Sequence, residues 1–151
     1  MTDLFEAAAR PRTRATQMVL DTSALIADPE SVFAFPGAAA IIPLVVIEEL
    51  DQLKTRPDDV GRAAREVIRT IETLRCGNGG DIGTPVPLPD GGTLHIETRG
   101  LDLDAIAGYG LEPSRPDNRI LAAALGHRCD DQRVVVVSND AALRIKAAQV
   151  G

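Results

Sequence analysis

The sequence is poor in aromatic residues and in cysteine. It contains three Phe, one Tyr and no Trp, so its core must be aliphatic. Aromatic platforms on which many single-strand binders stack bases are therefore not expected. Two cysteines, Cys76 and Cys129, are too few for a disulfide framework or a structural zinc site. His127 and Cys129 are close together in HRC, but their spacing matches no recognised metal motif, so we interpret both as structural residues.

The sequence also lacks a signal peptide and any apolar run long enough to span a bilayer. These absences predict a cytoplasmic protein that does not engage a membrane. There is no GxxxxGK[ST] motif, so a P-loop nucleotide site is not supported. The net charge is −6, whereas a passive nucleic-acid binder usually carries an excess of basic residues. The net charge argues less strongly against nucleic-acid binding if the acidic residues hold divalent cations.

The 151 residues suffice for one domain with a sizeable core, and the apolar pattern predicts strands alternating with helices. Short apolar runs predict strands at residues 18–20, 38–42 and 134–137. The last run is four consecutive valines, which is typical of a fully buried strand. Longer periodic segments predict helices at residues 44–54, 59–75, 114–127 and 140–149. Such alternation indicates an α/β fold with a parallel sheet and right-handed crossovers.

Two segments stand outside this alternation. Residues 1–16 place three arginines around Pro11, which predicts a flexible basic arm before a single domain at residues 17–151. Residues 76–92 are rich in Gly and Pro and lead into alternating residues around Asp90-Gly91-Gly92, which predicts a small hairpin. We expect the second arm of this hairpin, residues 94–97, to join the main sheet.

Four acidic residues occupy positions that suggest a shared site. Asp21 and Asp140 directly follow predicted strands, and ligands of open parallel sheets bind beyond the carboxyl ends of strands. Glu49 lies on the apolar face of its predicted helix, whereas Glu48 points almost opposite. Asp117 begins the helix face that is expected to pack on the sheet. Four such acids in one cleft would repel each other unless cations neutralise them.

Each of these acids also has a purely structural alternative. Asp21 and Asp140 are good helix N-caps, with Ser138 as a rival cap for the last helix. Ser114 and Asp117 resemble a capping box. If the four acids instead converge, their oxygen atoms suit Mg²⁺ or Mn²⁺, and two such ions can promote displacement at a phosphodiester.

Other charged residues compete less well for a catalytic role. Arg62, Arg65 and Arg69 form a stripe on the outer face of the helix at 59–75. This stripe is either an ordinary solvated face or a track for the phosphates of RNA. His95 and His127 do not lie beside a plausible nucleophile in the sequence, so a Ser–His–Asp arrangement is not supported.

The ordered segments VLDTSALI, IPLVVIEELDQLK, RPDNRILAAAL and VVVVSNDAALRIKA resemble a PIN domain. More narrowly, they resemble the PIN domain that precedes a PhoH-type ATPase in some bacterial proteins. The resemblance covers about residues 17–151, including the predicted hairpin. It implies a three-layer α/β/α fold with a central parallel sheet of order 3-2-1-4-5. It also implies cleavage of single-stranded RNA that depends on one or two Mg²⁺ or Mn²⁺ ions.

The resemblance further assigns roles to individual residues. Its acidic site maps onto Asp21, Glu49, Asp117 and Asp140. Ser23 and Ser138 match polar positions that orient ligands or water. Family members often form homo-oligomers or bind an antitoxin-like partner, and a PhoH-type ATPase domain would lie downstream.

We therefore expect a metal-dependent ribonuclease that hydrolyses phosphodiester bonds of single-stranded RNA. The alternative is a non-catalytic RNA-binding or partner-docking domain of a larger ATPase protein, in which the arginine stripe makes the contacts. A phosphotransfer domain with an aspartyl nucleophile is disfavoured. Phosphatases of that kind usually carry a second Asp two residues after the first, where this sequence has Ser23.

Overall fold

The computed structural model of the protein describes residues 15–151. The predicted basic arm therefore lies outside the described residues, except for its last two positions. Ala15 and Thr16 belong to strand β1 (Ala15–Leu20), because both residues pair with strand β5 (Gln132–Val137).

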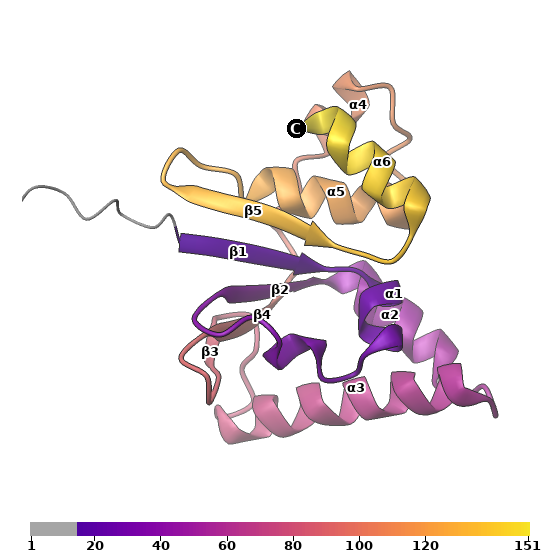
Figure 1. The fold of residues 1–151 in the computed structure, drawn as a ribbon, viewed down its shortest axis with the longest axis vertical. Helices are drawn as coiled ribbons and strands as arrows, with labels where there is room; N and C mark the ends of the chain where they lie inside the picture. The colour runs from indigo at the N-terminus through magenta and orange to yellow at the C-terminus, as the bar shows by residue number, and fades with distance from the viewer. Residues whose placement is uncertain (1–14) are drawn as a thin grey trace, which may run out of the picture.

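Five strands form a single sheet of order β3-β4-β2-β1-β5 (Figure 1). Strands β1, β2 (Ala39–Pro43), β4 (Thr93–Glu97) and β5 run parallel. Strand β3 (Val86–Pro87) pairs antiparallel with β4 and completes the predicted hairpin. The predicted α/β fold with a mostly parallel sheet is confirmed.

The strand order differs from the expected 3-2-1-4-5 in its last position. Counted along the chain, the four parallel strands lie in the order 3-2-1-4. Residues 15–151 contain no fifth parallel strand beside β5, so β5 is one edge of the sheet and the hairpin strand β3 is the other.

Helices flank the sheet in two groups, α1–α3 and α4–α6, which lie on opposite sides in Figure 1. The helices are α1 (Thr22–Ala27), α2 (Leu44–Leu53), α3 (Asp59–Gly77), α4 (Leu103–Gly108), α5 (Pro116–Gly126) and α6 (Ala141–Val150), with a short 3-10 turn at Ser31–Phe33. Helix α3 packs on α1 and α2, and α5 packs on α4, α6 and three strands of the sheet. No helix among residues 15–151 combines the length and apolarity needed to cross a bilayer.

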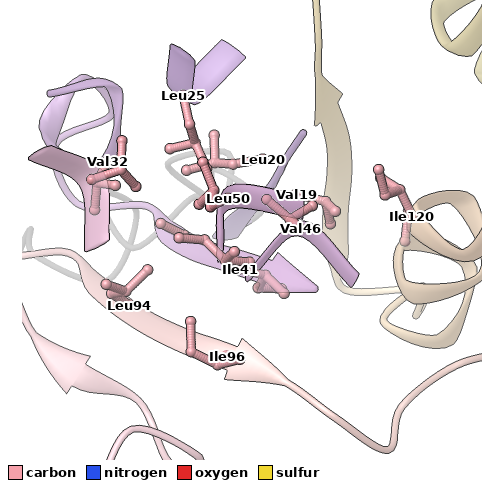
Figure 2. Packing of buried hydrophobic residues seen from close by; sticks show 14 of the residues in the cluster. Val19, Leu20, Leu25, Val32, Ile41, Val46, Leu50, Leu94, Ile96 and Ile120 are labelled. Carbon is pink, nitrogen blue, oxygen red and sulfur yellow. The ribbon is translucent and has the colours of Figure 1, made fainter. Parts of the chain in front are cut away.

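The core is aliphatic, as the scarcity of aromatic residues requires. Figure 2 shows how side chains from the strands and helices meet, among them Val19, Ile41, Leu94 and Ile120. Val46 and Leu50 on α2 are fully buried. Each such aliphatic side chain contributes roughly 1.5–3 kcal/mol when it leaves water. The burial of Val46 and Leu50 holds α2 against the core, and this helix carries Glu49.

The prediction of a fully buried last strand is wrong. The four valines at residues 134–137 do form β5, but each is only half-buried. The reason is position: β5 has a hydrogen-bonded neighbour on one side only, namely β1. A run of valines indicates a strand without indicating whether that strand is central or at an edge.

Candidate functional site

The pairing of β1 with β5 brings the residues that follow both strands together. The two strands are in register up to Leu20 and Val137, and the Asp21 N–H donates to the Val137 carbonyl at 3.0 Å. Asp21 and Ser138 therefore stand at neighbouring strand ends. The strand register that pairs the valines of β5 with β1 also places Asp21 beside Ser138.

Asp21 is buried, with a relative exposure of 6%. Its Oδ1 accepts the Thr22 N–H at 2.7 Å, which makes it the N-cap of α1. Its Oδ2 accepts the hydroxyls of Ser23 at 2.7 Å and Ser138 at 2.6 Å. The cap explains only one oxygen, whereas two serines from opposite ends of the chain hold the other oxygen in place.

Asp140 is exposed and caps α6. Its Oδ1 accepts the N–H groups of Ala142 at 2.9 Å and Leu143 at 3.3 Å. Ser138 does not cap this helix. Its hydroxyl accepts the Asp140 N–H at 2.9 Å and donates to Asp21, so one serine connects the two aspartates.

Glu49 and Glu48 point in different directions, as helical periodicity predicted. Glu49 is half-buried, whereas Glu48 is exposed. Burial raises the pKa of Glu49 above its usual value, and repulsion by the carboxylates of Asp21 and Asp117 raises it further. The Thr22 side chain opposes this shift only in part. The negative charges of Asp21 and Asp117 thus reach Glu49 from two other helix regions.

Asp117 is half-buried and is paired with a lysine that the sequence analysis did not consider. Its Oδ2 accepts Lys146 Nζ at 2.6 Å, and its Oδ1 accepts the Asn118 N–H at 3.0 Å. Lys146 also donates to Asn118 Oδ1 at 3.0 Å. Burial alone would raise the pKa of Asp117, but Lys146, the Asn118 N–H and the charge of Arg115 outweigh burial and lower it. Lys146 therefore balances part of the negative charge here.

The capping-box alternative for Asp117 is wrong. The residue that precedes α5 is Arg115, and no side chain caps this end of the helix. The Ser114 hydroxyl instead donates to the Glu112 carboxylate at 3.1 Å. Pro116 at the first helical position removes one N–H that would need a cap, which explains why α5 begins here without one.

We refer to Asp21, Glu49, Asp117 and Asp140 as the acidic cluster. Their oxygen-only donor set fits a hard divalent cation, and the pKa of Glu49 is raised first by burial and then by the negative charges of Asp21 and Asp117. The four acids do not form a closed chelate in this conformation. Within residues 15–151, only His95, Glu97 and His127 bring three potential ligand atoms within 4.8 Å of one another.

The arginine stripe lies on the exposed face of α3, as predicted. Arg62 pairs with Asp59 on the same helix. Arg65 donates to the carbonyls of Lys54 at 2.6 Å and Arg56 at 3.0 Å, so it ties α3 to the segment that follows α2. This contact gives Arg65 a structural role, and an RNA contact by the stripe stays a prediction.

Comparison with known proteins gives the same family as the motifs. Residues 18–151 match the family model described as PIN domain. Protein PhoH2 of Bacillus subtilis is 38% identical over 139 residues, which cover 88% of this chain and 31% of the relative. Protein PhoH2 of Thermobispora bispora is also 38% identical, over 92% of this chain and 31% of the relative. The Mycolicibacterium smegmatis protein of that name is 37% identical over 88% of this chain. The chain spans about a third of the length of these relatives.

Proposed function

Because this chain belongs to the PIN-domain family, whose fold is nuclease-like, we propose that it is a metal-dependent ribonuclease acting at the acidic cluster. The proposed reaction is hydrolysis of phosphodiester bonds in single-stranded RNA. The proposed cofactor is one or two Mg²⁺ or Mn²⁺ ions.

One observation carries the proposal: Glu49 is half-buried beside Asp21 and Asp117, and burial together with their charges raises its pKa. Folding alone does not favour an arrangement in which half-buried carboxylates repel one another. Sites that conflict with ordinary folding rules in this way are frequently functional. The arrangement becomes favourable when a divalent cation balances the charge.

Asp21, Asp117 and Asp140 are the proposed metal ligands, and Ser23 and Ser138 keep Asp21 in a fixed orientation. When bound, the ion would stabilise the negative charge that develops on the phosphate during the displacement. Glu49, with its raised pKa, is suited to accept a proton from the attacking water as the P–O bond to the leaving group breaks.

The test is cleavage of a mixed-sequence single-stranded RNA with Mn²⁺, with Mg²⁺ and with EDTA. Asp21→Asn removes one proposed ligand, and Asp51→Asn changes an exposed acid on α2 as the matched control. We expect metal-dependent cleavage that is lost in Asp21→Asn and kept in Asp51→Asn. Absence of metal-dependent cleavage by the folded wild type, or equal activity of the two variants, would contradict the proposal.

One observation favours the alternative of a non-catalytic RNA-binding or docking domain. Lys146 already neutralises Asp117, which is the usual fate of a structural carboxylate. In that case RNA would bind without being cut, and Arg69→Glu on the exposed stripe would weaken binding without any dependence on metal.

The longer relatives suggest partners for the proposed nuclease. Since the chain spans about a third of proteins named PhoH2, we propose that it works beside a PhoH-type ATPase domain. A homo-oligomer, an antitoxin-like partner and a cytoplasmic location remain predictions.

A further inference from the structure

A second group of potential metal ligands lies apart from the acidic cluster, and we call His95, Glu97 and His127 the histidine–glutamate cluster. His95 and Glu97 are two positions apart on β4, so their side chains lie on the same face of the strand. His127 directly follows the last residue of α5. The Glu97 Oε2 atom contacts both imidazoles, at 3.4 Å from His95 Nε2 and closer still to His127 Nε2.

The backbone after β4 holds the Glu97 carboxylate in place. Its Oε1 accepts the N–H groups of Arg99 at 2.9 Å and Gly100 at 2.6 Å, which leaves Oε2 directed at the two histidines. A side chain at position 100 would crowd this carboxylate, because a Cβ there would lie 3.0 Å from it. Carboxylates oriented by such outer hydrogen bonds are typical of metal sites.

The end of α5 is fixed against the same loop. A Cβ on Gly126 would lie 1.6 Å from the Gly100 carbonyl oxygen, so only glycine permits the two backbones to touch. The Asp102 N–H donates to the Ala122 carbonyl at 3.0 Å and adds a second link. These contacts hold the end of α5 against the loop that follows β4, and so they place His127 beside β4.

The three side chains are largely buried but retain an accessible side. Their exposed fractions are 13% for His95, 12% for Glu97 and 19% for His127. Glu97 also borders an open cleft of about 310 Å³, which gives solutes a path to this region. His95 Nδ1 is buried and makes no hydrogen bond with residues 15–151. The polar contact of this ring within the cluster is that of Nε2 with Glu97 Oε2.

The geometry points to a binding site for one transition-metal ion of the zinc type, held by His95, Glu97 and His127. Two imidazole nitrogens with one carboxylate oxygen form a donor set that Zn²⁺ favours, and three protein ligands leave a fourth position for water. The all-oxygen acidic cluster suits harder ions, so the two sites would select different metals. The bound ion would join the end of β4 to the end of α5. This inference does not rest on the proposed nuclease activity.

The test is a titration of metal-free protein of the full chain with Zn²⁺ in competition with a chromophoric chelator. We expect the tightest-bound equivalent of Zn²⁺ to depend on the histidine–glutamate cluster, so that His127→Ala and His95→Gln each lower its affinity at least about 10-fold. Asp51→Asn, which changes an exposed acid on α2, serves as a control for loss of a carboxylate outside both clusters. Cys129→Ser serves as a control for the exposed thiol two residues after His127. Neither control should change the affinity.

Two further measurements keep the outcome decisive if one variant folds poorly. Far-UV circular dichroism identifies variants that have lost the fold, and His95→Gln is the more conservative change. Co²⁺ bound to the wild type should give visible absorption bands of a four-coordinate nitrogen–oxygen site. One equivalent of Zn²⁺ should raise Tm in the wild type and in the control variants, but not in His95→Gln or His127→Ala. Absence of Zn²⁺ binding by the wild type, or unchanged binding in folded His95→Gln and His127→Ala, would overturn the inference.

Discussion

The acidic cluster and the histidine–glutamate cluster each contain a half-buried glutamate, and the two glutamates behave in opposite ways. Burial and two neighbouring carboxylates raise the pKa of Glu49. Burial also acts to raise the pKa of Glu97, but the N–H groups of Gly100 and Arg99 and the His127 ring outweigh it and lower the pKa to about 2. The partners of a carboxylate, more than its burial, decide whether it stays charged.

This difference separates two kinds of site on one sheet. The protein itself balances the charge of Glu97, so the histidine–glutamate cluster is organised without a ligand. In the acidic cluster, Lys146 and Arg115 act on Asp117, whereas burial and two carboxylates raise the pKa of Glu49, and we propose that a divalent cation supplies the missing positive charge. A preorganised site and an electrostatically unbalanced site should therefore respond differently to the same kinds of substitution.

The largest expected effect separates the two adjacent glutamates of α2. Glu49→Gln should lower metal-dependent RNA cleavage by about 100-fold or more, which is the range for loss of a general acid–base group. Glu48→Gln, an exposed neighbour on the same helix, should leave cleavage within about twofold because surface substitutions away from special features have small effects. Rates under single-turnover conditions provide the measurement. Equal losses of cleavage in the two variants would show that cleavage does not depend on the half-buried position of Glu49.

The next effect tests the rigidity of the histidine–glutamate cluster. Gly126→Ala should destabilise the fold by about 1–3 kcal/mol, because its new Cβ overlaps the Gly100 carbonyl oxygen. Gly108→Ala at the end of α4 meets nothing within 4 Å and is the matched control. Urea unfolding measures both variants, and Zn²⁺ affinity should fall only in Gly126→Ala. A neutral Gly126→Ala would show that the loop moves freely, which would remove the contrast between the clusters.

A smaller effect concerns the lysine that balances Asp117. Lys146→Met should lower the Mn²⁺ concentration needed for half-maximal binding by about threefold, because the metal no longer competes with an ammonium group for this carboxylate. Lys54→Met removes the other lysine of the chain, which pairs with Asp51 at the surface, and should leave Mn²⁺ binding unchanged. Calorimetric titration measures both affinities. Weaker Mn²⁺ binding in Lys146→Met would show that Lys146 supports the site instead of competing with the metal.

The smallest effect is on stability without metal. Since the pKa of Glu49 is raised in the folded state above its ordinary 4.5, wild-type protein loses stability as the pH rises through that raised pKa. Glu49→Gln lacks this loss, so at pH 7 it should melt at a higher temperature than wild type in EDTA. The difference should vanish below pH 4.5, where both side chains are neutral in both states. A lower Tm for Glu49→Gln at pH 7 would mean that Glu49 is balanced by partners, as Glu97 is.

Local patterns in the sequence predicted the strands, the hairpin and the direction of Glu49 well. Helical periodicity distinguishes Glu49 from Glu48 because one turn of α2 is anchored by the buried Val46 and Leu50. Asp21 and Asp140 were placed after two strands of a parallel sheet, and the pairing of β1 with β5 confirms that these strands are neighbours.

Contacts set by topology were not predictable in the same way. The sequence contains no local motif that joins His95 to His127, and these residues meet only because the loop after β4 touches the end of α5. Lys146 was not considered from the sequence, because only the packing of α6 on α5 brings it to Asp117. The half-exposed valines of β5 were misjudged because strand propensity does not reveal a sheet edge.

The pairing of β1 with β5 also fixes when the acidic cluster can exist during synthesis. A ribosome delivers the chain from its N-terminus, so Asp21 emerges long before Ser138 and Asp140. Until β5 docks on β1, Asp21 lacks the Ser138 hydroxyl and Asp117 lacks Lys146. An unfinished chain therefore carries the first acids of the proposed nuclease without their final partners. The acidic cluster therefore stays incomplete until the segment from β5 to α6 has been synthesised and has docked on β1 and α5.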